Sequence, residues 1–154
     1  MTALRRAATP ETAPALHRLL SDSALSHAAL GACGLPLAIL NAGTPARPVC
    51  YVNPAFESFF GYRADEALGR PLATLVFRGD EALVHRLLAE SPSRWQLKAG
   101  CKDGMVRHVE LTIGAVRSAA EGRLTHWVAA FSDRSELERL RSELEALRTL
   151  ASTP

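Results

Sequence analysis

Residues 51–69 read YVNPAFESFFGYRADEALG, and this stretch decides the fold that the sequence predicts. Asn53 and Pro54 mark the end of a strand and the start of a helix, because proline has no N–H for a sheet ladder and its fixed φ suits a first helical turn. Asn53 can cap this helix with its side-chain oxygen. Aromatic residues then recur at helical spacing, so one side of the helix needs burial; they are Phe56, Phe59 and Phe60. A second short helix is expected over 63–68.

The chain has 154 residues and a formal net charge of +2, which suit one domain with a sizeable core. Lysine and arginine are scattered among aspartate and glutamate, so the charge pattern gives no indication of a nucleic-acid partner. No apolar run approaches the roughly 20 residues that span a bilayer, and the N-terminus lacks a secretory signal pattern. The sequence therefore predicts a cytoplasmic protein without a membrane partner.

The cysteines Cys33, Cys50 and Cys101 are odd in number and far apart, and none occurs in C-x-x-C spacing. We expect free thiols rather than a disulfide scaffold or a metal site. The sequence also lacks the common nucleotide-binding, hydrolase, zinc-protease and kinase motifs. It therefore predicts no enzymatic activity and no catalytic residue.

Apolar periodicity and turn residues predict two strands, small helices, three strands and a final helix, in that order. Lys102-Asp103-Gly104 is expected to be a hairpin turn between the third and fourth strands. This order predicts an α+β domain with one five-stranded antiparallel sheet. The strands are expected over 36–40, 49–52, 95–101, 106–116 and 124–132. The later small helices are expected as one turn over 71–76 and a longer helix over 79–89.

We expect three parts along the chain. Residues 1–33 form an N-terminal helical extension with a disordered start over 1–8 and two short helices, the first from Thr9 and the second over 24–32. Residues 34–133 form the core domain. Residues 134–154 form a C-terminal amphipathic helix and tail.

The last strand is apolar on both sides. Its alternation places Trp127, Ala129 and Phe131 on one face and Val128 and Ala130 on the other. A strand of this kind needs cover on both sides. The small helices can cover one face of the sheet, and the terminal helices or a second subunit must cover the other.

The final helix is expected to begin with a capping box of Ser135 and Glu138. Its leucines recur at 3-4-3 spacing, which is the pattern of a coiled-coil seam over two heptads. They are Leu137, Leu140, Leu144 and Leu147. Because two heptads are marginal alone, we predict that the seam acts with another interface in a homodimer.

Four segments within about residues 34–135 carry a family resemblance: YVNPAFESFFGY, DEALGR, the turn KDG, and FSDRSELER. They resemble the PAS domain, a sensor module of bacterial signalling. The resemblance implies a curved sheet whose helical face encloses a ligand pocket, and signalling through terminal helices in a dimer. It also implies that Asp133 and Ser135 form the junction with an output helix.

The resemblance extends to the light-oxygen-voltage type, which binds flavin and carries G-x-N-C-R-F-L-Q after the second small helix. Here residues 69–76 read GRPLATLV, so Leu72 stands in place of the thiol that would add to the flavin. The positions expected to bind the ring correspond to Ala99, Val109 and Phe131. Burying the polar edge of a flavin without partners costs roughly 1–3 kcal/mol per group. Flavin is therefore not the expected cofactor.

A haem-binding PAS domain would need an axial histidine near the third helix. His85 is the candidate, but it falls at the edge of the apolar stripe of that helix, and a surface position is the simpler interpretation. His108 and His126 are predicted to face away from the pocket. No cofactor is thus expected, although a flavin- or haem-bearing light, redox or gas sensor stays an alternative.

The remaining prediction is an apolar pocket that is empty or holds a small apolar ligand. The simpler explanation is that the same residues only fill a core. The candidate lining residues are Ile39, Phe56, Phe60, Leu72, Leu75, Val84, Leu88, Leu97, Val109, Leu111, Trp127 and Phe131. We predict a stand-alone sensor or interaction module whose partners are a second copy and a downstream signalling protein. A regulatory fragment of a larger kinase or cyclase is the other alternative.

Overall fold

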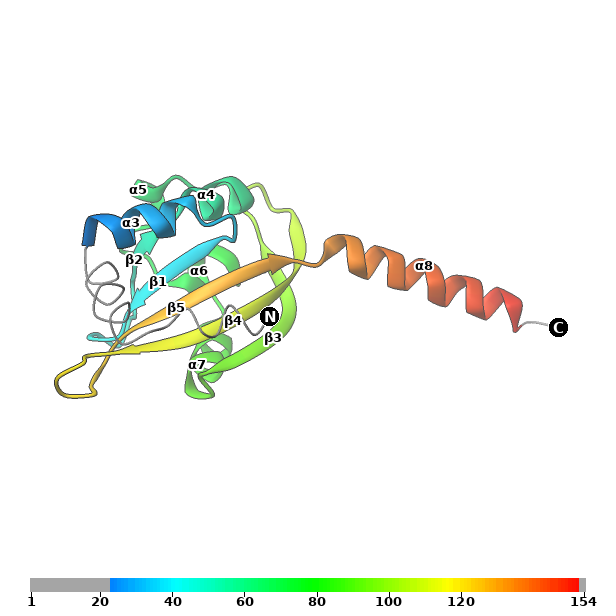
Figure 1. Cartoon of the computed structure of the whole chain (residues 1–154). Coiled ribbons are helices and arrows are strands. Elements are labelled where there is room, and N and C mark those ends of the chain that lie inside the picture. Colours follow the sequence, from blue (N-terminus) through cyan, green and yellow to red (C-terminus); the bar gives the residue numbers. More distant parts are fainter. Residues whose placement is uncertain (1–22, 153–154) are drawn as a thin grey trace, which may run out of the picture. The chain divides into compact units, whose positions relative to one another are not determined.

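The computed structural model describes residues 23–152 and shows a five-stranded sheet with helices (Figure 1). The chain divides after Cys33 into two compact units. The first contains helix α3, which spans Ser23–Ala32, close to the short helix predicted over 24–32. The disordered start and the helix predicted from Thr9 lie outside the described residues.

The sheet belongs to the second unit, and its strands lie in the order β2-β1-β5-β4-β3. Every neighbouring pair is antiparallel, which confirms the predicted fold class. The first and last strands of the core, β1 and β5, thus lie side by side at the centre. The strands span Leu37–Asn41 (β1), Val49–Val52 (β2), Ser93–Gly100 (β3), Val106–Arg117 (β4) and Leu124–Asp133 (β5).

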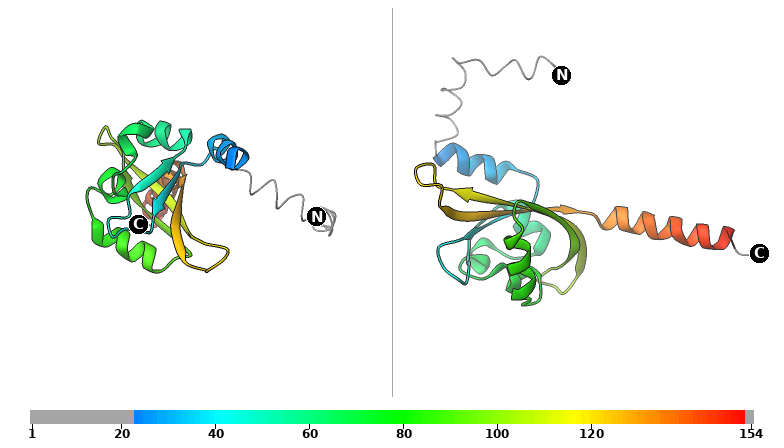
Figure 2. Two further views of the ribbon diagram at one scale, coloured as in Figure 1. Left: turned by 90° about the vertical axis from the view of Figure 1, so that its left-hand side faces the viewer. Right: turned by 90° about the horizontal axis from the view of Figure 1, so that it is seen from below.

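Four short helices connect β2 to β3, and the views in Figures 1 and 2 agree that they gather on one face of the sheet. A longer helix, α8, follows β5 directly and spans Ser135–Ala151. No residue of α8 is buried. The four short helices are Pro54–Phe60 (α4), Ala64–Ala67 (α5), Leu72–Val76 (α6) and Glu81–Ala89 (α7).

The core lies between these helices and the facing side of the sheet. On β5, Ala129 and Phe131 are buried and point into the core, whereas Val128 and Ala130 lie half-buried on the opposite face. Trp127 is half-buried and packs against the core. The face assignment that the alternation of the last strand predicted is therefore confirmed.

Asn53 holds the start of α4 to the start of β1. Its Oδ1 accepts hydrogen bonds from the Phe56 N–H at 3.0 Å and from the Leu37 N–H at 2.9 Å, while its Nδ2 donates to the Leu35 carbonyl at 2.9 Å. The first bond is the predicted helix cap. Gly61 ends α4 with φ +83°, a conformation that favours glycine.

The capping box predicted for the final helix is absent. The described α8 starts at Ser135, and its N-cap residue, Arg134, makes no side-chain capping bond. Instead, Asp133 Oδ1 accepts a hydrogen bond from the Ser135 N–H at 2.9 Å. Glu138 forms an ion pair with Arg141 at 3.6 Å. The Asp133 side chain thus supplies the acceptor for the first N–H of α8, because an aspartate can bond the N–H two residues further on.

Candidate functional site

The residues predicted to line a pocket mostly meet in one place. Those from α4, α6, α7 and the centre of the sheet belong to a single buried cluster, and Leu97 and Trp127 pack against it half-buried. Ile39 is the exception, because it pairs with Val128 on the opposite face of the sheet and is not part of the cluster. Its place among the lining residues was therefore wrong.

Three phenylalanine rings fill the centre of this cluster. Phe56 and Phe60 on α4 have ring centroids 4.7 Å apart, and Phe60 lies 5.0 Å from Phe131 on β5. All three side chains are fully buried. Their tilted and edge-on arrangement is a favourable one for aromatic rings. Residues that the sequence analysis assigned to a pocket thus pack against one another in the core.

The buried residues do not fit a flavin ring. Leu72, which the resemblance places at the reactive thiol, is 3% exposed, and the apolar Ala99, Val109 and Phe131, which it places at the ring-binding side chains, are buried. Within residues 23–152, Asn53 is the one polar residue classed as buried, and its side chain is bonded to backbone groups. The polar edge of a flavin would find no side-chain partner in this cluster.

The histidine considered for haem is also unsuitable. His85 is exposed on α7, and its Nδ1 lies 3.4 Å from Arg47 Nη1. The neighbouring residues that do point into the core are Val84, Leu87 and Leu88. The ring of His85 could bind a haem in the core only if α7 rotated about its axis.

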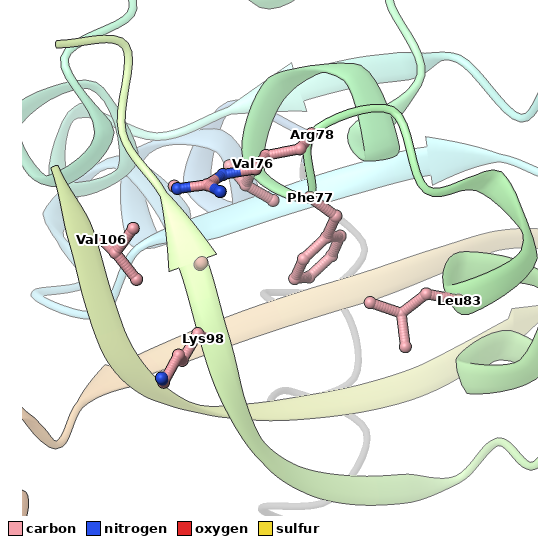
Figure 3. Close-up of a pocket in the computed structure, with 8 residues that line it drawn as sticks. Val76, Phe77, Arg78, Leu83, Lys98 and Val106 are labelled. Atoms are coloured by element: carbon pink, nitrogen blue, oxygen red, sulfur yellow. The ribbon is translucent and has the colours of Figure 1, made fainter. Parts of the chain in front are cut away.

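A hollow of about 410 Å³ lies beside the core, between the α6–α7 connection and β3 (Figure 3). Apolar side chains of Phe77, Leu83 and Val106 line it, together with the cationic Arg78 and Lys98. The sequence analysis missed it. The sequence signal that could have indicated it is the break between two apolar helices at residues 77–79. In the structure, Arg78 and Gly79 both adopt positive φ at this break.

The thiols offer no substitute for the missing flavin-reactive cysteine. Cys50 on β2 and Cys101 after β3 are free thiols, as predicted. Burial raises the pKa of the Cys50 thiol, whose Sγ donates to the Ile39 carbonyl at 3.4 Å. Cys101 Sγ donates to the Phe59 carbonyl at 3.4 Å. Neither residue belongs to α6, where Leu72 lies.

The junction of β5 with α8 is tied to β4. The Arg134 N–H donates to the His108 carbonyl at 2.7 Å, and Arg134 Nη1 lies 3.7 Å from Glu110 Oε1. Asp133 Oδ2 lies 3.6 Å from Arg107 Nη1. Asp133 thus contacts both β4 and the first N–H of α8.

Leucines along α8 are exposed to solvent. The four leucines of the predicted seam are 47–63% exposed, and Leu150, which the sequence analysis did not include, is 72% exposed. Ion pairs between Arg139 and Glu143 at 2.8 Å and between Arg141 and Glu138 at 3.6 Å join the charged residues of the same helix.

The family follows from a comparison with protein families. The model of the PAS domain matches residues 37–136, which run from β1 to the start of α8. The chain belongs to the PAS domain family. Domains of this family are sensory modules, and the five-stranded antiparallel sheet with its helices is the predicted PAS fold.

Curated relatives of this PAS chain include a light-activated kinase. A "Blue-light-activated histidine kinase" of Brucella abortus is 35% identical over 124 residues, which cover 77% of this chain and 25% of that protein. A "Putative adagio-like protein 2" of Oryza sativa is 38% identical over 77 residues, covering 50% of this chain and 12% of that protein. The chain thus spans a quarter or less of the length of these relatives.

Solved structures share the PAS fold. An RNA-binding light-oxygen-voltage receptor superimposes with a TM-score of 0.72 at 26% identity, over 88% of this chain and 38% of that one. The PAS domain of a protein from Colwellia psychrerythraea has a TM-score of 0.62 at 14% identity, over 72% of this chain and 95% of that one. Among the described residues of this PAS chain, no helix has both the length and the apolar character to cross a membrane.

Proposed function

We propose that this chain is a PAS sensor module that dimerises through α8 and passes its signal across the junction between β5 and α8. Its core holds the chain's own side chains or a small apolar ligand, rather than flavin or haem. The observation that carries this proposal is the leucine seam. A regular stripe of large apolar side chains stays exposed on a helix with no buried residue.

The physical case for a second copy rests on burial. Burying a leucine side chain stabilises by about 1.5–3 kcal/mol. A lone subunit therefore lacks the stabilisation that burial of the seam leucines would provide. The seam itself carries no charge, whereas the arginines and glutamates beside it pair along the same helix. A stripe of this kind is typical of a coiled-coil helix and supports a second copy as the partner. Two heptads are short, so further contacts are expected to support the dimer.

The junction supports the path of the signal. A change in the core would reach Phe131 and then Asp133 on the same strand, and Asp133 bonds the first N–H of α8. The orientation of α8, and with it the way its seam meets a partner, would respond. A downstream signalling protein would read this change.

The dimer is tested by native mass of the full chain at tens of micromolar concentration. We expect a dimer for the wild type, a monomer for Leu144→Glu, and a dimer for the matched control Ala146→Glu, which adds the same charge off the seam. The core of the monomeric variant should stay folded, because Leu144 is 50% exposed and lies outside the buried cluster. A monomeric wild type, or loss of the dimer in both variants alike, would refute the seam as the interface.

A second candidate is a flavin-bearing light sensor or the input domain of a larger histidine kinase. The names of the Brucella relatives favour it, since those proteins are described as blue-light-activated histidine kinases. The apolar residues at the thiol and ring-binding positions argue against flavin photochemistry. They leave open the role of an input domain that responds to another stimulus. Visible absorption separates the flavin candidate from the first proposal.

A further inference from the structure

A second hollow, of about 520 Å³, lies where β1 begins and β5 ends. It is separate from the hollow in Figure 3, with which it shares no lining residue. Leu35, Pro36, Phe59 and Phe131 give it a largely apolar lining. The two charged side chains of the lining are Arg107 and Asp133. Ligand sites commonly combine an apolar lining with a few directed polar groups in this way.

Arg107 has hydrogen-bonding capacity that the described residues do not use. Its Cζ lies 4.6 Å from the centre of the Phe59 ring, which is a cation–π contact. Its Nη1 lies 3.6 Å from Asp133 Oδ2, longer than the about 2.7–2.9 Å of a close charge-assisted bond. Its Nε is buried and has no hydrogen-bond partner. A guanidinium carries five N–H donors, so Arg107 can bond a further acceptor beside Asp133.

We propose that this hollow binds a small molecule with an apolar body and one carboxylate. The two oxygens of a carboxylate match the fork of an arginine and can accept from its two terminal nitrogens together. The apolar body would contact Leu35, Pro36 and Phe59. The charge of Arg107 selects an anionic head group over a neutral or cationic one.

The site is placed to act on α8, and this step rests on the proposed function. Asp133 contacts Arg107 through Oδ2 and the Ser135 N–H through Oδ1. A carboxylate that takes Arg107 brings a second negative charge beside Asp133, and like charges repel at this range. Asp133 then turns away from the hollow and releases the first N–H of α8. Ligand binding is thereby linked to the start of the output helix.

Binding is tested with three probes of equal chain length: octanoate, 1-octanol and octylammonium. We expect calorimetry to show octanoate binding about ten- to a hundredfold more tightly than octanol, from a hydrogen-bonded charge, and no binding of octylammonium. The side-chain N–H signal of Arg107 Nε should shift with octanoate alone. Equal affinities for octanoate and octanol would overturn the proposal.

Variants separate this site from a merely structural role. Arg107→Gln should lose the preference for octanoate over octanol, whereas the control Arg94→Gln, at an arginine that is 71% exposed on β3, should keep it. Ala55→Phe places a ring in the hollow and leaves Arg107 unchanged, so it should block binding even if Arg107→Gln does not fold. Unchanged octanoate binding in Ala55→Phe would overturn the assignment of the site.

Asp133→Asn should strengthen octanoate binding, whereas the Arg107 and Ala55 variants should weaken it. Asp133→Asn removes the competing charge, so octanoate should bind about two- to fivefold more tightly, as expected for loss of a partly exposed ion pair. Amide exchange at Ser135 should also quicken when octanoate is added to the wild type. Weaker binding in Asp133→Asn would overturn the competition, and binding without a change at Ser135 would overturn the link to α8. Neither outcome depends on whether α8 dimerises, which native mass measures separately.

Discussion

Replacing Asn53 by alanine should destabilise this domain more than the loss of an ordinary helix cap. The side chain is fully buried and holds three backbone groups: the N–H of Phe56, the N–H of Leu37 and the carbonyl of Leu35. Alanine removes all three bonds at once. The first belongs to α4 and the other two to the chain that enters β1, so one substitution loosens two elements that are distant in sequence.

The size of the expected loss in unfolding free energy follows from how deeply each bonded group is buried. Loss of the cap on Phe56 costs about 1 kcal/mol. The Leu37 N–H is left without its partner in a buried position, which costs about 1–3 kcal/mol. The Leu35 carbonyl is less buried and can regain a partner from water. The free energy of unfolding should therefore fall by about 3 kcal/mol, with a melting temperature about 10 °C lower for a domain of this size.

The assay is urea unfolding followed by circular dichroism, with Asp80→Ala as the matched control. Asp80 also caps a helix, because its Oδ1 accepts from the Leu83 N–H at 3.0 Å, but it is exposed and makes that one capping bond. Its loss should cost about 1 kcal/mol. If the two variants were equally stable, the bonds to Leu37 and Leu35 would contribute nothing and the reasoning would be refuted.

Two further predictions concern acidic side chains. Hydrogen bonds from the Arg63 N–H and from the Lys102 side chain hold the pKa of Glu66 below its ordinary value. A carboxyl with a depressed folded-state pKa stabilises the fold above its unfolded pKa, and this contribution disappears as the pH falls through the folded pKa. Urea unfolding of Glu66→Gln should thus lose less stability on acidification than the wild type does. Asp133→Ala should lower the free energy of unfolding by about 1 kcal/mol, because the Ser135 N–H loses its acceptor; an unchanged thermal melt and native mass would remove this role.

Much of the fold could be predicted because local signals agreed with one another. The alternation of the last strand indicated both of its faces, and Asn53-Pro54 indicated the start of α4. Ile39 was misplaced because β1 reads Leu-Ala-Ile-Leu-Asn, and an apolar run of this kind has no period-two signal to distinguish its faces.

The remaining features depend on contacts between distant parts of the chain. The capping box at Ser135 was a reasonable local prediction, but Asp133 satisfies that N–H first. The second hollow, which Arg107 lines, combines residues from just before β1, from α4, from β4 and from the end of β5. No periodicity brings these residues together, because their meeting depends on the central pairing of β1 with β5 and of β5 with β4.

The central claim, a PAS sensor whose core does not hold flavin, is tested most directly by visible absorption. The protein would be refolded with excess flavin mononucleotide, desalted, and its spectrum recorded before and after blue illumination. We predict no retained flavin and no light-dependent change, because apolar residues occupy the thiol and ring-binding positions. One retained flavin per chain would contradict the claim, and a reversible bleaching of its absorption would establish the photoreceptor instead.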